Sequence, residues 1–206
     1  MTRIGFAISV LFAVGSFGAD PQERPNGLYA VFNTSAGSFT ARLYEKETPV
    51  TVQNFVALAE GTKPTLDPKT GKMVRRRLYN GITFHRVVRG EMIQAGDPTG
   101  TGAHNCGVTI QDEILPGLRF DGAGKLAMAN TGQPNTGGCQ IFVTVNAMRP
   151  WDGNYAIFGY IVEGRDVVTA INRMPVRGDR PVDPVKLISV TIQRVGPEPV
   201  MKKGKR

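Results

Sequence analysis

One arginine inside an apolar run is the residue of this chain best placed for chemistry. The segment Phe84–Asp97 reads FHRVVRGEMIQAGD, and its Arg86 falls among apolar residues that are typical of a strand. A second segment, Met128–Val143, reads MANTGQPNTGGCQIFV and is a Gly/Asn/Pro-rich loop that leads into an apolar strand. We expect the two segments to form one surface, an apolar pocket with a single guanidinium beside it. Because a guanidinium is rigid and always charged, it suits the role of a fixed hydrogen-bond donor to a bound molecule.

Other catalytic arrangements find little support. His85 and His104 are the only histidines, and they come without a cluster of carboxylates, so we predict no metal site. Gly100–Gly102 is similar to part of a phosphate loop, but the following Lys-Ser/Thr and the strand-to-helix context are missing. Cys139 is not part of a nucleophile elbow. We interpret Asp112–Glu113 as a loop with capping roles, and we expect no cofactor.

The composition indicates one globular domain. The chain has 206 residues, enough for a hydrophobic core, and 41% of them are hydrophobic. Its 25 glycines and 14 prolines favour many turns and short strands. The net charge of +8 raises the question of a nucleic-acid partner. Apart from Arg75–Arg77 and Lys202–Arg206 the cations are scattered, and no aromatic stripe accompanies them, so we expect no nucleic-acid partner.

The N-terminus predicts export. Arg3 precedes an apolar run from Ile4 to Phe17, which is too short to span a membrane comfortably. Ser16 and Gly18 are small residues at the positions that a signal peptidase requires for a cut after Gly18. We interpret residues 1–18 as a signal peptide, with an uncleaved anchor or a buried helix as the alternatives, and residues 19–27 as a flexible lead. The expected location is periplasmic or secreted, without stable membrane insertion after cleavage.

Two cysteines, Cys106 and Cys139, flank the expected site in Gly-rich loops. An exported protein folds in an oxidising compartment, where disulfides persist. A bridge between the two cysteines and a pair of free thiols both stay open, because the sequence does not test the geometry that a disulfide requires.

Many short strands and two helices are expected to position the site. Thr48 as N-cap, Pro49 at the first helical position and Gly61 as a stop predict a helix over Pro49–Glu60, and a second helix is predicted over Asp166–Arg173. The polar stretch Thr62–Leu78 is interpreted as an exposed loop. Strands are predicted over residues 28–33, 38–44, 81–94, 124–129, 140–146, 155–162 and 185–195. This pattern favours a mainly β domain, a closed barrel with helices over its ends, followed by a basic tail at residues 196–206.

Four motifs in this order resemble those of the cyclophilins, a family of peptidyl-prolyl cis-trans isomerases. They are FHRVV-x-G-x-M-I-Q-x-G-D at Phe84–Asp97, L-x-M-A-N-x-G at Leu126–Gly132, PNTGGCQIFV at Pro134–Val143 and DGNYAIFG at Asp152–Gly159. The resemblance covers residues 28–195, and the DPTGTG loop is similar to bacterial members. It implies a closed eight-stranded antiparallel barrel capped by two α-helices.

The resemblance also implies roles for individual residues. Arg86 matches the catalytic arginine of the family. Trp151 falls where the family usually has a pocket leucine, and Tyr155 falls where many members have histidine. Ala129 and Asn130 match a loop whose backbone pairs with the substrate chain. The full set of implied substrate-binding residues is Met92, Gln94, Ala129, Asn130, Gln140, Phe142, Trp151 and Tyr155.

Three residues depart from the family pattern. Glu91 stands in place of a pocket phenylalanine and brings a carboxylate toward Arg86. Pro150 stands in place of the tryptophan of cyclosporin-sensitive members. Arg89 replaces a common proline and is a candidate partner for Glu91. The implied function is faster X–Pro bond rotation in exported proteins during folding. The alternative is a low-activity module that binds Pro-containing segments as a chaperone. The expected partners are Pro-containing polypeptides, and the expected state is a monomer.

Overall fold

The computed structural model describes residues 24–198, and the structural statements below concern this part of the chain. The expected signal peptide, residues 19–23 of the expected flexible lead and residues 199–206 of the expected tail lie outside the described residues. The end of the lead that is described is attached to the barrel, because Arg24 donates to both carboxylate oxygens of Glu163 at 2.7 and 2.8 Å. No helix within residues 24–198 has the length and apolar character to cross a membrane.

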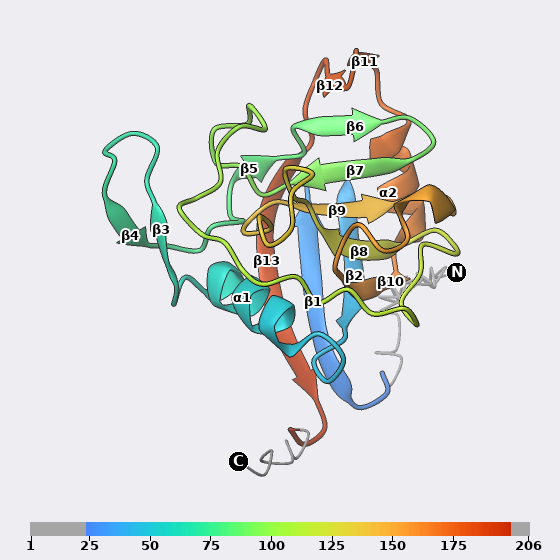
Figure 1. The fold of residues 1–206 in the computed structure, drawn as a ribbon. Helices are drawn as coiled ribbons and strands as arrows, with labels where there is room; N and C mark the ends of the chain where they lie inside the picture. The colour runs from blue at the N-terminus through green and yellow to red at the C-terminus, as the bar shows by residue number, and fades with distance from the viewer. Residues whose placement is uncertain (1–23, 199–206) are drawn as a thin grey trace, which may run out of the picture.

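Strands dominate the described chain, and two α-helices accompany them (Figure 1). The helices are α1 (Pro49–Glu60), α2 (Arg165–Asn172) and a short 3₁₀ turn, η1 (Arg149–Trp151). The strands are β1 (Gly27–Thr34), β2 (Gly37–Leu43), β3 (Pro64–Leu66), β4 (Met73–Arg75), β5 (Ile82–Thr83), β6 (Arg86–Val88), β7 (Met92–Ala95), β8 (Lys125–Met128), β9 (Ile141–Thr144), β10 (Ile157–Glu163), β11 (Val176–Arg177), β12 (Arg180–Pro181) and β13 (Lys186–Val195). The predicted bounds of α1 are confirmed, and α2 begins and ends one residue earlier than predicted.

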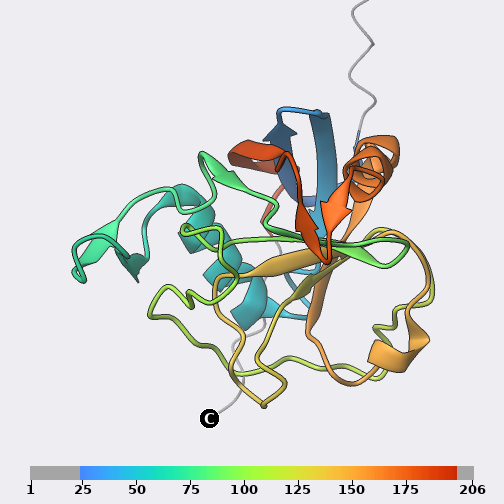
Figure 2. The same cartoon turned by 90° about the horizontal axis from the view of Figure 1, so that it is seen from above.

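Nine strands form one curled antiparallel sheet in the order β5-β13-β1-β2-β10-β8-β9-β7-β6. The expected closed eight-stranded barrel is therefore wrong in strand number and in closure, since no ladder of the described chain joins β5 to β6. These two edge strands are consecutive, with only Phe84 and His85 between them. The strand predicted over residues 81–94 is therefore broken at this bend. The bend carries the chain from one edge of the curled sheet to the other. The mainly β fold with two helices is confirmed, and the helices lie at opposite ends of the curled sheet (Figures 1 and 2).

The barrel core follows from cross-strand pairing. Phe32 of β1 pairs with Phe39 of β2, and the two rings stack with centroids 4.6 Å apart. Residues paired in this way point to the same face of a sheet, so alternate positions along both strands enter the core. Helix α1 adds Phe55, whose ring lies 6.0 Å from that of Phe32, and α2 adds Ile171. Burial of these apolar side chains holds the strands that carry the site.

Two local predictions are corrected. The stretch Thr62–Leu78 is not only loop, because β3 and β4 pair as a hairpin that projects from the barrel (Figure 1). Thr48 occupies the N-cap position of α1, but its hydroxyl donates to the carbonyl of Tyr44 and caps no helical N–H. Glu113 takes over this task across the fold, since its two carboxylate oxygens accept the N–H groups of Val50 and Thr51 at 3.0 and 2.8 Å. A carboxylate at a helix N-terminus also interacts favourably with the helix dipole.

Candidate active site

The site is built on the outer face of strands β6, β7 and β9. The sheet register places Arg86 beside Gln94 and Gln94 beside Phe142. Since side chains alternate between the faces of a sheet, the intervening residues Val87 and Ile93 point inward, where they are buried in the barrel core. The same short strands therefore supply part of the core and an outer row of side chains that ends in a cation.

A cavity of about 340 Å³ lies over this outer row. Eight of the predicted site residues line it, namely Arg86, Met92, Gln94, Ala129, Asn130, Phe142, Trp151 and Tyr155. Gln140 lines an adjacent cavity of about 200 Å³, which shares Gln94, Ala129 and Asn130 with the first. All nine predicted residues therefore meet at one place, although their roles stay predictions.

The floor of the larger cavity is a hydrophobic cluster separate from the barrel core, formed by Met92, Phe120, Ala127, Phe142 and Ile157. The ring of Phe142 stacks on Phe120 at a centroid distance of 5.9 Å. It also meets Trp151 at 5.6 Å and Tyr155 at 5.2 Å in edge-to-face geometry, which fixes the orientation of aromatic rings. The cavity thus combines a rigid aromatic floor with polar side chains in its lining, among them Arg86, Glu91 and Gln94.

The guanidinium of Arg86 is held from two sides. Its Nε donates to Oδ2 of Asp179 at 3.1 Å, and its Nη2 lies 3.1 Å from the same oxygen. On the other side its Nη1 donates to Oε1 of Gln94 at 3.3 Å. The Arg86 side chain is 48% exposed, so hydrogen bonds rather than packing set its orientation.

A chain of hydrogen bonds runs from Gln94 toward the neighbouring loop. The Nε2 of Gln94 donates to Oε1 of Gln140 at 2.8 Å. The Nε2 of Gln140 in turn donates to the carbonyl oxygens of Gly102 and His104 at 2.9 and 3.1 Å. Through these bonds the position of Gln94 depends on the conformation of residues 97–107, which we call the disulfide loop.

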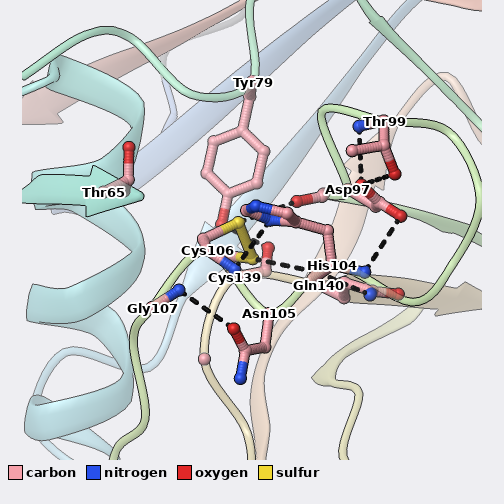
Figure 3. Close-up of a disulfide and its surroundings, with 12 residues drawn as sticks. Thr65, Tyr79, Asp97, Thr99, His104, Asn105, Cys106, Gly107, Cys139 and Gln140 are labelled. Carbon is pink, nitrogen blue, oxygen red and sulfur yellow. Dashed lines mark hydrogen bonds between the residues drawn. A yellow bond between two sulfur atoms is a disulfide. The ribbon is translucent and has the colours of Figure 1, made fainter. Parts of the chain in front are cut away.

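The disulfide loop is tied down by a bridge between Cys106 and Cys139, which decides between the two alternatives that the sequence left open. Both cysteines are buried. Figure 3 shows the bridge beside Gln140 and the hydroxyl of Tyr79, which donates to the Cys139 carbonyl at 3.1 Å. Close approach of the backbones is possible because Gly96 has φ of 108° and no side chain, where a Cβ would overlap the Cys139 carbonyl.

Asp97 organises the start of the same loop (Figure 3). Its Oδ1 accepts the N–H and the hydroxyl of Thr99, and its Oδ2 accepts the N–H groups of Gly102 and His104. Burial by itself raises the pKa of the Asp97 carboxyl, but the hydrogen bonds from Thr99, His104 and Gly102 outweigh it and lower the pKa to about 2. The carboxylate is therefore a stable charged centre for the start of the loop.

Sequence reasoning missed some residues of the site and misplaced one contact. Asp179 was not predicted, because it lies 93 residues from Arg86 in a turn without periodic pattern. Phe120 was also missed, since it follows a loop rather than a recognisable strand. The expected pair of Arg89 and Glu91 is wrong, because Arg89 donates instead to backbone carbonyls near the end of α2. Glu91 does line the pocket, and it forms no ion pair in the described part of the chain.

Within residues 24–198 no group of three or more His, Cys, Asp or Glu side chains is placed to hold a metal ion.

Known proteins share this fold and sequence pattern. The family model described as cyclophilin type peptidyl-prolyl cis-trans isomerase matches residues 29–192. The chain is 43% identical over 170 residues to peptidyl-prolyl cis-trans isomerase B of Streptomyces anulatus, covering 81% of this chain and 97% of that protein. It is 42% identical over 173 residues to peptidyl-prolyl cis-trans isomerase-like 1 of Aspergillus fumigatus, covering 82% and 97%.

A solved structure agrees. The crystal structure of a cyclophilin type peptidyl-prolyl cis-trans isomerase of Cryptosporidium parvum superposes with a TM-score of 0.71 at 29% identity, covering 82% of this chain and 98% of that one. The chain described here therefore belongs to the cyclophilin family. Its activity follows from the same findings: it is a peptidyl-prolyl cis-trans isomerase, and enzymes of this family act on proline-containing substrates.

Proposed function

We propose that this isomerase accelerates X–Pro bond rotation in exported proteins while they fold, with Arg86 as its catalytic residue. The observation that carries the assignment of the residue is the guanidinium of Arg86 at the edge of a cavity with an aromatic floor, held by Gln94 and Asp179. In this arrangement a charged donor is fixed in place before the substrate binds.

The chemistry requires no bond to be made or broken. Rotation of a peptide C–N bond is opposed by its partial double-bond character, with a barrier of about 18–20 kcal/mol. In the twisted state the resonance is lost, and the prolyl nitrogen becomes a better hydrogen-bond acceptor. A donor that bonds the twisted amide more strongly than either planar form lowers the barrier. Arg86 supplies this donor, and Gln94 keeps it in position.

The pocket supplies the grip that rotation needs. Met92, Phe142 and Trp151 enclose the proline ring, while the residue before proline rotates outside the cavity. Ala129 and Asn130 offer backbone groups to the substrate chain at the rim. Gln140 and Tyr155 complete the binding surface at its two ends.

The proposed setting is a bacterial periplasm or the outside of a cell, with the enzyme as a monomer. Two observations support export: the signal-like residues 1–18 and the buried disulfide, which suits an oxidising compartment. The proposed clients are therefore secreted or periplasmic polypeptides that contain proline.

One observation favours a second function, a chaperone-like module that binds Pro-containing segments with little turnover. Glu91 lines the pocket and has no ion-pair partner among residues 24–198. An unpaired carboxylate makes an apolar pocket less favourable for a proline ring. High affinity for an unfolded protein together with slow isomerisation would support this alternative.

A protease-coupled assay on a peptide with an Ala-Pro bond tests the proposal. We expect measurable turnover in the wild type and a loss of roughly 10²-fold in Arg86→Ala, the cost of removing one preorganised donor. Arg149→Ala is the matched control, because Arg149 is also exposed and ion-paired but does not line the cavity. Full activity in Arg86→Ala would refute the catalytic role, and undetectable turnover in the wild type would favour the chaperone alternative.

A further inference from the structure

We infer that Asp179 is a positioning residue for Arg86, and that the β11–β12 hairpin is therefore a working part of the active site. The inference rests on the proposed role of Arg86. It starts from the carboxylate of Asp179, whose Oδ2 lies 3.1 Å from both Nε and Nη2 of Arg86.

The hairpin presents Asp179 at its tip. Strands β11 and β12 pair through Val176 with Pro181 and Arg177 with Arg180, which leaves Gly178 and Asp179 as a two-residue turn. Gly178 has φ of 61°, a left-handed conformation that such turns require and that glycine adopts without strain. The turn therefore fixes the backbone position from which the Asp179 side chain extends toward Arg86.

The same residue is fixed a second time through its backbone. Strand β6 is an edge of the large sheet, so its outer N–H groups have no partner strand. The carbonyl of Asp179 accepts the N–H of Val87 at 2.7 Å, next to Arg86 in the chain. Asp179 thus binds strand β6 through its backbone and the guanidinium of Arg86 through its side chain. The position of β6 and the orientation of the guanidinium are therefore both coupled to the hairpin.

The remaining donors of Arg86 show what this arrangement achieves. A guanidinium has five N–H groups. The contacts with Asp179 and Gln94 engage Nε and one N–H on each terminal nitrogen. One N–H on Nη1 and one on Nη2 stay available for a substrate. Without Asp179, a half-exposed arginine side chain would sample many rotamers, and only the 3.3 Å bond to Gln94 would select the productive one.

Exchange NMR on an Ala-Pro peptide tests the inference, because it separates the rate of isomerisation on the enzyme from the affinity. We expect Asp179→Ala to slow isomerisation roughly tenfold through misplacement of Arg86, with little change in Kd. Asp179→Asn should keep activity within about threefold of wild type, since an amide oxygen still accepts a hydrogen bond, though a weaker one. Asp183→Asn is the control: Asp183 is an exposed carboxylate nearby that forms no ion pair among residues 24–198.

A double-mutant cycle decides whether the effect passes through Arg86. If it does, Asp179→Ala has no further effect in the Arg86→Ala background. An equal loss in both backgrounds, or a wild-type rate in Asp179→Ala, would overturn the inference while leaving the role of Arg86 intact. If Arg86→Ala itself kept full activity, the proposed function would fail first, and the two failures are therefore distinguishable. Unchanged thermal unfolding of Asp179→Ala excludes misfolding as the cause of a lower rate.

Discussion

The two sides of the β6–β7 strand pair are held by different interactions. On one side, the disulfide loop is joined covalently to Cys139 and organised by the buried carboxylate of Asp97. On the other side, the β11–β12 hairpin reaches Arg86 through an ion pair whose two side chains are 48% and 51% exposed. Both sides act on the same row of side chains, because Gln94 contacts Arg86 and is itself held by Gln140.

The two sides therefore have different effects: the disulfide side contributes to the stability of the fold, and the hairpin side sets the orientation of the Arg86 side chain. A covalent bridge and a buried charged centre change the free energy of unfolding, whereas an exposed ion pair contributes little to it. An exposed pair still selects one orientation of a flexible side chain. We therefore expect mutations on the disulfide side to affect mainly folding, and mutations on the hairpin side to affect mainly turnover.

Removal of the disulfide should have the largest effect on stability. The bridge joins residues that are 33 positions apart, and a closed loop of this length stabilises the folded state by about 3–4 kcal/mol. We expect the Cys106→Ser/Cys139→Ser variant to lose this amount in urea unfolding at neutral pH. Wild type unfolded under reducing conditions is the matched comparison and should show a similar loss. A loss below about 1 kcal/mol would mean that hydrogen bonds alone hold the loop.

Acid should weaken the same side through Asp97. Its pKa is about 2 in the folded protein against 3.8 for an ordinary aspartate, so the unfolded chain binds a proton first as the pH falls. This contribution of about 2 kcal/mol is present above pH 4 and is lost between roughly pH 4 and pH 2. Unfolding free energies of wild type and Asp97→Asn, measured across this range, should converge as the pH falls.

His85 sets the upper end of the pH range in which acid lowers the stability of the protein. Burial lowers the pKa of His85, so the folded protein keeps this imidazole neutral while the unfolded chain takes up a proton below its usual pKa near 6.5. This loss of stability therefore begins at a higher pH than that of Asp97 and is present in both variants. A constant difference between wild type and Asp97→Asn from pH 5 to pH 2 would contradict the assignment to Asp97.

Much of the fold could be predicted because local signals and tertiary structure agree. The helix α1 is bounded by Pro49 and Gly61, whose backbone preferences act within the segment itself. The nine predicted site residues meet at one place because eight of them lie in the four short motifs, whose strands are neighbours in the sheet, and Trp151 directly precedes the last motif. In these places the structure that the sequence pattern predicts is also the structure that the packing stabilises.

The remaining features depend on contacts that local patterns do not encode. The β3–β4 hairpin lies in a polar stretch without apolar alternation, so no periodicity predicted it. The capping of α1 by Glu113 joins residues more than 60 positions apart. The two strands of the β11–β12 hairpin have two residues each, too few for a period to appear. Asp179 was therefore found only from its place beside Arg86.

The ion pair on the hairpin side should have the smallest effect on stability. Since both side chains are about half exposed, we expect Asp179→Ala to change the free energy of urea unfolding by less than about 0.5 kcal/mol. The backbone bond from Val87 to the Asp179 carbonyl survives this substitution, so the hairpin stays attached to β6. A loss above about 1 kcal/mol would show that the pair stabilises the fold and would remove the contrast with the disulfide side. Because salt screens exposed charges but leaves the hydrogen bond in place, about 1 M NaCl should slow wild-type isomerisation no further than to the rate of Asp179→Asn and leave Asp179→Ala nearly unchanged.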